Sequence, residues 1–115
     1  MPARLRPEEP EAVAAALAGP RGPAERRLLT KHFLALLARR APGRSVEVRV
    51  PPYAAVQVIE GVRHTRGTPP AVVELDPDTW IALATGALGW AEAVADGLVR
   101  ASGERADLAG YLPLV

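Results

Sequence analysis

The chain has 115 residues, of which 49% are hydrophobic and only 4% are aromatic. A domain of this length buries roughly two-thirds of the surface of its unfolded chain, so we expect one domain, 1–115, with a core of Ala, Val and Leu. The formal net charge is +1, from 14 basic and 13 acidic residues, which lacks the basic excess that nucleic-acid binding requires. Because the chain has no cysteine, disulfides, thiol nucleophiles and thiolate metal sites are excluded.

The N-terminal residues carry acids ahead of a short alanine-rich run. This pattern is typical of neither a signal peptide nor a membrane span, so we expect a cytoplasmic protein without stable membrane insertion. Residues 1–7 are expected to form a loose arm, and residues 8–40 a helical part. The first helix is predicted over Glu8–Leu17, because Gly19 and Pro20 stop it.

The second helix is predicted from Ala24 to about Arg40. Its apolar residues recur at i, i+3 and i+4 spacing, which is typical of a helix with one buried face: Leu28, Leu29, Phe33, Leu36 and Leu37. His32 lies on the same arc. We interpret it as a histidine at the edge of the core that bonds a carbonyl, and not as a catalyst.

The hydrophobic period changes to two after Ser45. Valines alternate with charged residues over Val46–Val50, which predicts a half-buried strand that Pro51 and Pro52 end. Further strands are predicted over Ala55–Glu60, with Val56 and Val58 on one face, and over Ala71–Leu75.

The segment that follows starts with a strong helix signal. Asp76 is a helix cap and Pro77 occupies the first helical position. Trp80 and Leu83 share one face of this helix, and a second short helix that starts near Trp90 ends at Gly97. We interpret both tryptophans, Trp80 and Trp90, as core anchors that can equally form the wall of a cavity.

A brief strand over Leu98–Ser102 and a closing amphipathic helix complete the expected elements, with Leu108, Tyr111 and Leu112 on the apolar face of that helix. The order of elements predicts an α+β fold. It consists of a single mixed β-sheet of four to five strands over residues 45–115, covered by helices and preceded by two N-terminal helices.

The most concentrated polar segment is Glu60–Pro70. Arg63 and Arg66 suit a bidentate grip on a carboxylate or phosphate, and His64 adds a donor. The alternative is a solvated loop whose arginines pair with Glu60 or Glu74.

Catalytic patterns are missing from the sequence. It has no nucleophile elbow, phosphate-binding glycine loop, zinc-binding histidine pair or dinucleotide fingerprint. The acids Glu74, Asp76 and Asp78 lie close together, but helix capping accounts for both aspartates. We therefore predict no catalytic residue, no metal site, no cofactor and no enzymatic activity.

The run D-x-x-T-W-x-x-L-A-T-G-x-L-x-W-x-x-A-V-A-x-G-x-V-x-A-S-G, from Asp76 to Gly103, resembles the sterol-carrier-protein type-2 family. The positions that carry the resemblance are Asp76, Trp80, Leu83, Gly86, Ala93, Gly97, Val99 and Gly103. The segment Arg49–Pro70 looks like a bacterial branch of that family, and the resemblance extends over about residues 41–115. It implies a five-stranded mixed sheet with an apolar tunnel beneath the helices; four strands are evident here, with 63–70 in place of a fifth.

The leading functional hypothesis is non-enzymatic binding of a small apolar or lipid-like ligand. The expected apolar wall consists of Val56, Val58, Trp80, Leu83, Val94 and Leu98, and the expected polar mouth of Arg63, His64 and Arg66.

Two alternatives stay open. In the first, a domain with a closed core self-associates as a homodimer or docks on a partner enzyme through the helix Glu8–Leu17. In the second, an enzyme uses His64 and its neighbouring arginines on an anionic substrate, although nothing in the sequence positions a nucleophile.

Overall fold

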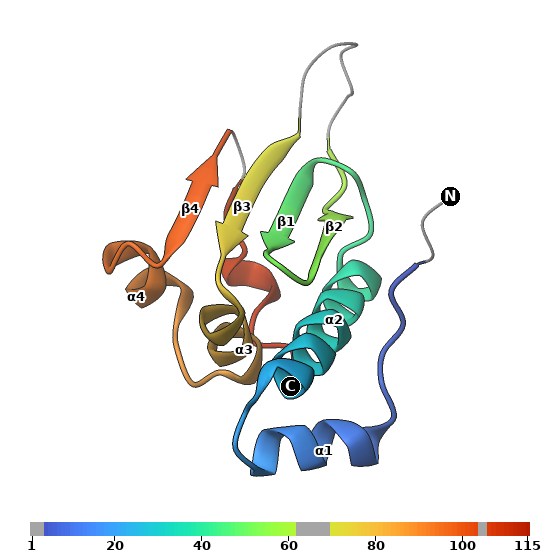
Figure 1. The fold of residues 1–115 in the computed structure, drawn as a ribbon. Coiled ribbons are helices and arrows are strands. Elements are labelled where there is room, and N and C mark those ends of the chain that lie inside the picture. Colours follow the sequence, from blue (N-terminus) through green and yellow to red (C-terminus); the bar gives the residue numbers. More distant parts are fainter. Residues whose placement is uncertain (1–3, 62–69, 104–105) are drawn as a thin grey trace.

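The protein is described here by a computed structural model that covers residues 4–61, 70–103 and 106–115 (Figure 1). Its helices are α1 (Pro10–Ala18), α2 (Pro23–Arg40), α3 (Pro77–Thr85) and α4 (Trp90–Ala95), and a 3-10 turn, Ala109–Tyr111, lies near the C-terminus. Its strands are β1 (Val46–Val50), β2 (Ala54–Val58), β3 (Ala71–Leu75) and β4 (Val99–Ser102). The α+β class and the two N-terminal helices are confirmed.

The strands form one mixed sheet in the order β2-β1-β3-β4. β1 runs parallel to β3, while the β1–β2 and β3–β4 pairs are antiparallel. The expected single mixed sheet is therefore confirmed with four strands among the described residues. The segment proposed to replace a fifth strand falls mostly at 62–69, outside those residues.

One face of the sheet is apolar and the other is charged. Val46, Val48 and Val50 are fully buried, whereas Arg49 between them is exposed. Since the register pairs Val48 with Val56 and with Val73, the valines of neighbouring strands share the inward face. Burying each valine contributes about 1.5–3 kcal/mol, so this face fixes where the helices pack.

Helix α2 is buried over a wider arc than its apolar spacing predicts. Leu34 and Ala35 are buried in addition to Leu29, Phe33 and Leu37 of the predicted stripe. The reason is that α2 packs against α1, α3 and β2, while residues 4–9 run alongside it (Figure 1). The indole N–H of Trp80, which is fully buried, donates to the carbonyl of Thr30 at 3.2 Å and joins α3 to α2.

The closing segment and the end of β2 differ from the expectation. The closing helix is a single 3-10 turn, because Gly110 and Pro113 leave too few residues to nucleate an α-helix. Instead, the Arg40 guanidinium holds this segment by donating to the carbonyls of Tyr111 (3.0 Å) and Pro113 (2.7 Å). Strand β2 ends at Val58 and not at Glu60, because the following residue has a left-handed backbone, φ 67°.

Candidate functional site

The residues predicted to form an apolar wall do not all lie together. Val58, Trp80 and Leu83 lie in the core with at most 1% of their surface exposed, and Val56 packs against the same core. Val56 and Val58 lie on β2, which packs against α2, so these residues belong to one core that spans α2 and α3. Val94 on α4 and Leu98 before β4 are 48% and 41% exposed, so these two face solvent.

A pocket of about 400 Å³ lies beside Leu98, where β3 enters α3 and α4 leads into β4. Its lining residues are Pro51, Glu74, Leu75, Asp76, Gly97, Leu98 and Arg100. We call it the β4 pocket. Leu75 is a core residue with 4% exposure, so the pocket reaches from solvent to the edge of the apolar interior.

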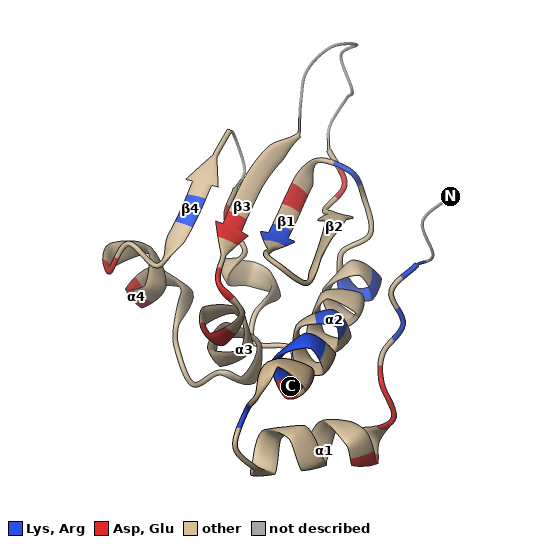
Figure 2. Cartoon of the chain, viewed as in Figure 1, with Lys and Arg blue, Asp and Glu red and all other residues tan. Residues whose placement is uncertain are grey.

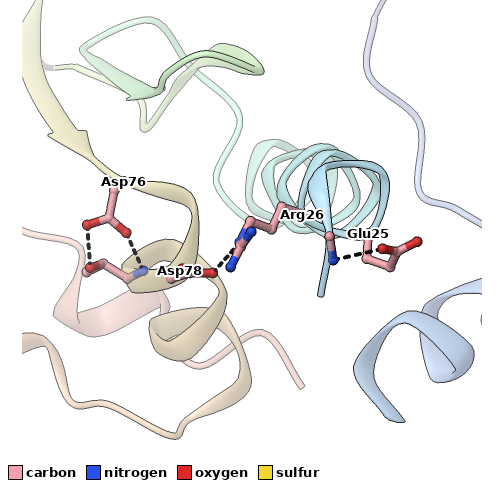
Figure 3. A network of polar contacts seen from close by, with 6 residues as sticks. Glu25, Arg26, Asp76 and Asp78 are labelled. Atoms are coloured by element: carbon pink, nitrogen blue, oxygen red, sulfur yellow. Dashed lines mark hydrogen bonds and ion pairs between the residues drawn. The ribbon is translucent and has the colours of Figure 1, made fainter. Parts of the chain in front are cut away.

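Of the three charged residues that line the β4 pocket, Glu74, Asp76 and Arg100, Asp76 has a structural role. Asp76 caps α3: its carboxylate accepts from the Thr79 backbone N–H at 2.8 Å and from the Thr79 hydroxyl at 3.0 Å (Figure 3). The neighbouring Asp78 pairs with Arg26 of α2 at 2.9 Å (Figure 3). Capping by Asp76 is thus confirmed. Within the described ranges, no group of three acids or histidines is arranged to hold a metal ion.

The predicted polar mouth, Arg63, His64 and Arg66, lies at 62–69, outside the described residues. The functional interpretation of that segment stays a prediction.

A second pocket, of about 520 Å³, is rich in arginine. The segment before α1, the end of α2, the loop before β1 and strand β2 line it through Arg4, Leu5, Arg6, Ala35, Ala38, Arg39, Pro42, Gly43, Arg44 and Gln57. We call it the arginine pocket. None of these lining residues is acidic, and Figure 2 shows the basic residues of the N-terminal segment opposite the end of α2.

His32 holds the N-terminal segment against α2. The backbone N–H of Glu8 donates to Nδ1 of His32 at 2.9 Å, and Leu5 packs against the core. Burial lowers the pKa of His32, while the nearby Glu8 carboxylate opposes this shift. His32 is buried at the core edge as predicted, but the expected carbonyl partner was wrong: the ring accepts a hydrogen bond from a backbone N–H.

The loop before β1 is fixed by a close backbone approach. A Cβ at Gly43, where φ is 152°, would come within 2.1 Å of the Ile59 backbone. The Ile59 carbonyl accepts from the Ser45 N–H at 3.0 Å and from its hydroxyl at 2.6 Å, and the Ile59 N–H donates to the Ala41 carbonyl at 2.7 Å. The left-handed conformation of Ile59 is maintained by these contacts, and they hold Arg44 at the rim of the pocket.

Sequence reasoning missed the arginine pocket. Arg39 was placed only as part of the second predicted helix, and Arg4 and Arg6 were assigned to a loose arm. The only sequence signal is the density of arginine near both ends of this helical part. The pocket exists because tertiary contacts bring three separate segments together.

Comparison with known proteins places most of this fold in one family. The model of a family described as "Bacterial SCP ortholog" matches residues 23–114, from α2 to the C-terminal segment. The match excludes α1 and the segment before it, which includes Arg4 and Arg6. No curated protein sequence matches the chain. In the described part of the chain, every helix is too short or too polar to cross a bilayer.

Proposed function

This chain belongs to the bacterial SCP ortholog family, and from that premise we propose that it binds a small apolar or lipid-like ligand without catalysing a reaction on it. The family points to carrier-type binding in general. The resemblance of Asp76–Gly103 to sterol-carrier proteins supports the same class of ligand. Because this segment forms α3, α4 and β4, we place the ligand beside these elements.

The ligand site lies between the sheet and the helices α3 and α4. The observation that carries this proposal is the β4 pocket, which joins the core residue Leu75 to the exposed Leu98. Side chains already occupy the interior, so a ligand that enters from this pocket must displace one of the covering elements. The proposed wall remains Val56, Val58, Trp80, Leu83, Val94 and Leu98.

The element that moves is α4, and not α3. Helix α3 buries five of its nine residues, including Trp80, whereas α4 buries only Ala93 of six. Burial of a side chain the size of Leu contributes about 1.5–3 kcal/mol, so α3 is held far more strongly than α4. Elements with little buried apolar surface open first. An opening there would uncover the inner face of the sheet next to Leu75.

The polar end of this ligand is proposed to meet Arg63, His64 and Arg66. Guanidinium groups pair in bidentate fashion with carboxylate and phosphate, which would orient an anionic head group.

An uncharged fluorescent fatty alcohol tests this proposal, because its binding does not depend on arginine. The double variant Val94→Ser, Leu98→Ser removes the exposed part of the wall, and we expect affinity to fall by at least about tenfold, since 1.4 kcal/mol corresponds to a factor of ten. Val115→Ser is the matched control, because this exposed residue lies at the C-terminus. If wild-type protein purified without detergent carries no ligand in native mass spectrometry and does not bind the alcohol, the proposal is wrong.

A second candidate function is an interaction domain, either as a homodimer or on a partner enzyme. Val94 and Leu98 favour it, because they are the large hydrophobic residues exposed before the C-terminus in the described ranges. The outer face of α1 fits this role less well, since Val13, Ala16 and Leu17 pack inward. Sedimentation of the Val94→Ser, Leu98→Ser variant separates the two functions: loss of self-association without any loss of alcohol binding favours the interaction domain.

A further inference from the structure

We propose that the arginine pocket binds an organic oxyanion, a phosphate ester or a carboxylate attached to a short apolar group. This site is separate from the one between the sheet and α3–α4, and it does not depend on the proposed carrier function. Half of its arginines, Arg4 and Arg6, come from the segment that the family match does not include.

The positive charge of the residues that line the pocket favours an anionic ligand. Four guanidinium groups line it, and within residues 4–61, 70–103 and 106–115 none of the four side chains makes an ion pair or hydrogen bond. Other arginines differ: Arg26 pairs with Asp78, Arg49 with Glu47, and Arg40 donates to two carbonyls. The four positive charges around one concave surface repel each other. A bound oxyanion attracts each of them and so offsets this repulsion, and it also accepts bidentate hydrogen bonds from the guanidinium groups.

The floor of the pocket is apolar, which favours a ligand that also carries an apolar group. Leu5 is half-buried, Ala35 is only 2% exposed, and Ala38 lies beside them. A volume of about 520 Å³ is far larger than one phosphate ion needs and falls in the range of small-molecule sites, roughly 300–1,000 Å³. The ligand is therefore an anion with a short hydrocarbon portion and not a bare ion.

The backbone that carries these arginines is held in place before the ligand arrives. The contact of Gly43 with Ile59 fixes the loop that carries Arg44, and the hydrogen bond from Glu8 to His32 fixes the segment that carries Arg4 and Arg6. A preorganised site loses less entropy when it binds.

One feature of the pocket opposes an anion. Arg39 lies in the last turn of α2, where the carbonyls carry about half an elementary negative charge. The four guanidinium groups that line the pocket carry four full positive charges, which exceed this partial negative charge.

Calorimetry with octyl phosphate tests the site, together with octanol and inorganic phosphate as partial ligands. The double variant Arg39→Gln, Arg44→Gln removes two exposed guanidiniums, and the variant Arg21→Gln, Arg27→Gln removes the same charge away from the pocket. We expect octyl phosphate to bind wild type at least tenfold more tightly than either partial ligand. The pocket variant should lose at least tenfold in affinity and the control variant less than twofold, and binding should weaken with added salt.

Other results overturn the proposal. Equal affinity in the pocket variant and the control means that net charge, and not this pocket, attracts the anion. Equal affinity for octyl phosphate and inorganic phosphate contradicts the apolar floor. Vesicles distinguish a lipid head group in a membrane from a free organic phosphate. Binding to phosphatidylglycerol vesicles but not to monomeric octyl phosphate would mean that this face contacts a membrane, and it would contradict a pocket for a free ligand. The uncharged fatty alcohol should bind the pocket variant with the same affinity as wild type. Loss of alcohol binding would therefore count against the carrier function, and loss of octyl phosphate binding in the pocket variant concerns the arginine pocket alone.

Discussion

The two ends of the sheet are built differently, although one apolar face runs through both. At the β2 end, hydrogen bonds from Ser45 and Ile59 and the close approach of Gly43 tie together segments that are distant in sequence. At the β4 end, the six-residue helix α4 buries one residue and leaves Val94 and Leu98 in solvent. The β2 end is therefore held by contacts between distant segments, while the β4 end is covered by a helix with little buried surface.

The largest expected contrast between the ends comes from two glycines with positive φ. Gly43→Ala places a Cβ against the Ile59 backbone, and we expect it to lower the free energy of unfolding by about 3 kcal/mol. Gly97→Ala meets nothing within 4 Å, so it carries only the cost of a left-handed residue, about 1–2 kcal/mol. Urea denaturation of both variants measures the difference. Equal losses would show that the β2 end is no more tightly built than the β4 end.

The next effect concerns pH at the β2 end. Because burial lowers the pKa of His32, this ring takes up a proton less readily in the folded state than in the unfolded state. His32 therefore contributes stability that is complete above pH 6.5 and is lost as the pH falls through the lowered, folded-state pKa.

The variant His32→Leu is the control for this pH dependence, since it has no titrating ring and no acceptor for the Glu8 N–H. Denaturation between pH 7.5 and 5 should show a decline in wild type that is weaker in the variant. The same decline in both would assign the pH dependence to carboxylates such as Glu8, whose charge acts on the ring.

A smaller effect is expected at the β4 end. Val94→Ser with Leu98→Ser changes exposed side chains, so the free energy of unfolding should change by no more than about 0.5 kcal/mol per site. Val58→Ser, a fully buried change on the inward face of β2, should be several times more destabilising. Similar losses from both would mean that α4 is packed more firmly than its exposure indicates.

The smallest effect is expected at the junction of α2 and α3. Arg26 and Asp78 form an exposed pair at 2.9 Å, and such pairs contribute little net stability. Arg26→Gln should leave the melting temperature unchanged within error. A clear drop would make this ion pair a real anchor of α3.

Most elements could be predicted from sequence because their signals are local. Alternating valines identify β1, and the cap and proline at Asp76 and Pro77 identify the start of α3. Ile59 could not be predicted, since nothing local favours a left-handed isoleucine; it depends on contacts with Ser45 and Ala41. The arginine pocket was missed for the same reason.

The proposed ligand wall was only partly placed by its pattern. Helical spacing correctly groups Trp80 with Leu83 on the buried face, because it reflects the core. The spacing of Val94 does not reveal that its short helix sits at the rim, where no element covers it. Periodicity predicts which face is apolar, and the length of each element decides whether that face is covered.

Ligand entry at the β4 end is tested most directly by hydrogen–deuterium exchange with and without a saturating uncharged fatty alcohol. Amides of α4 and β4, residues 90–102, should gain protection on binding, while those around 36–46 beside the arginine pocket should exchange unchanged. Protection that appears only at the β2 end, or that is absent from 90–102 despite measured binding, would contradict a ligand that enters between α4–β4 and the core.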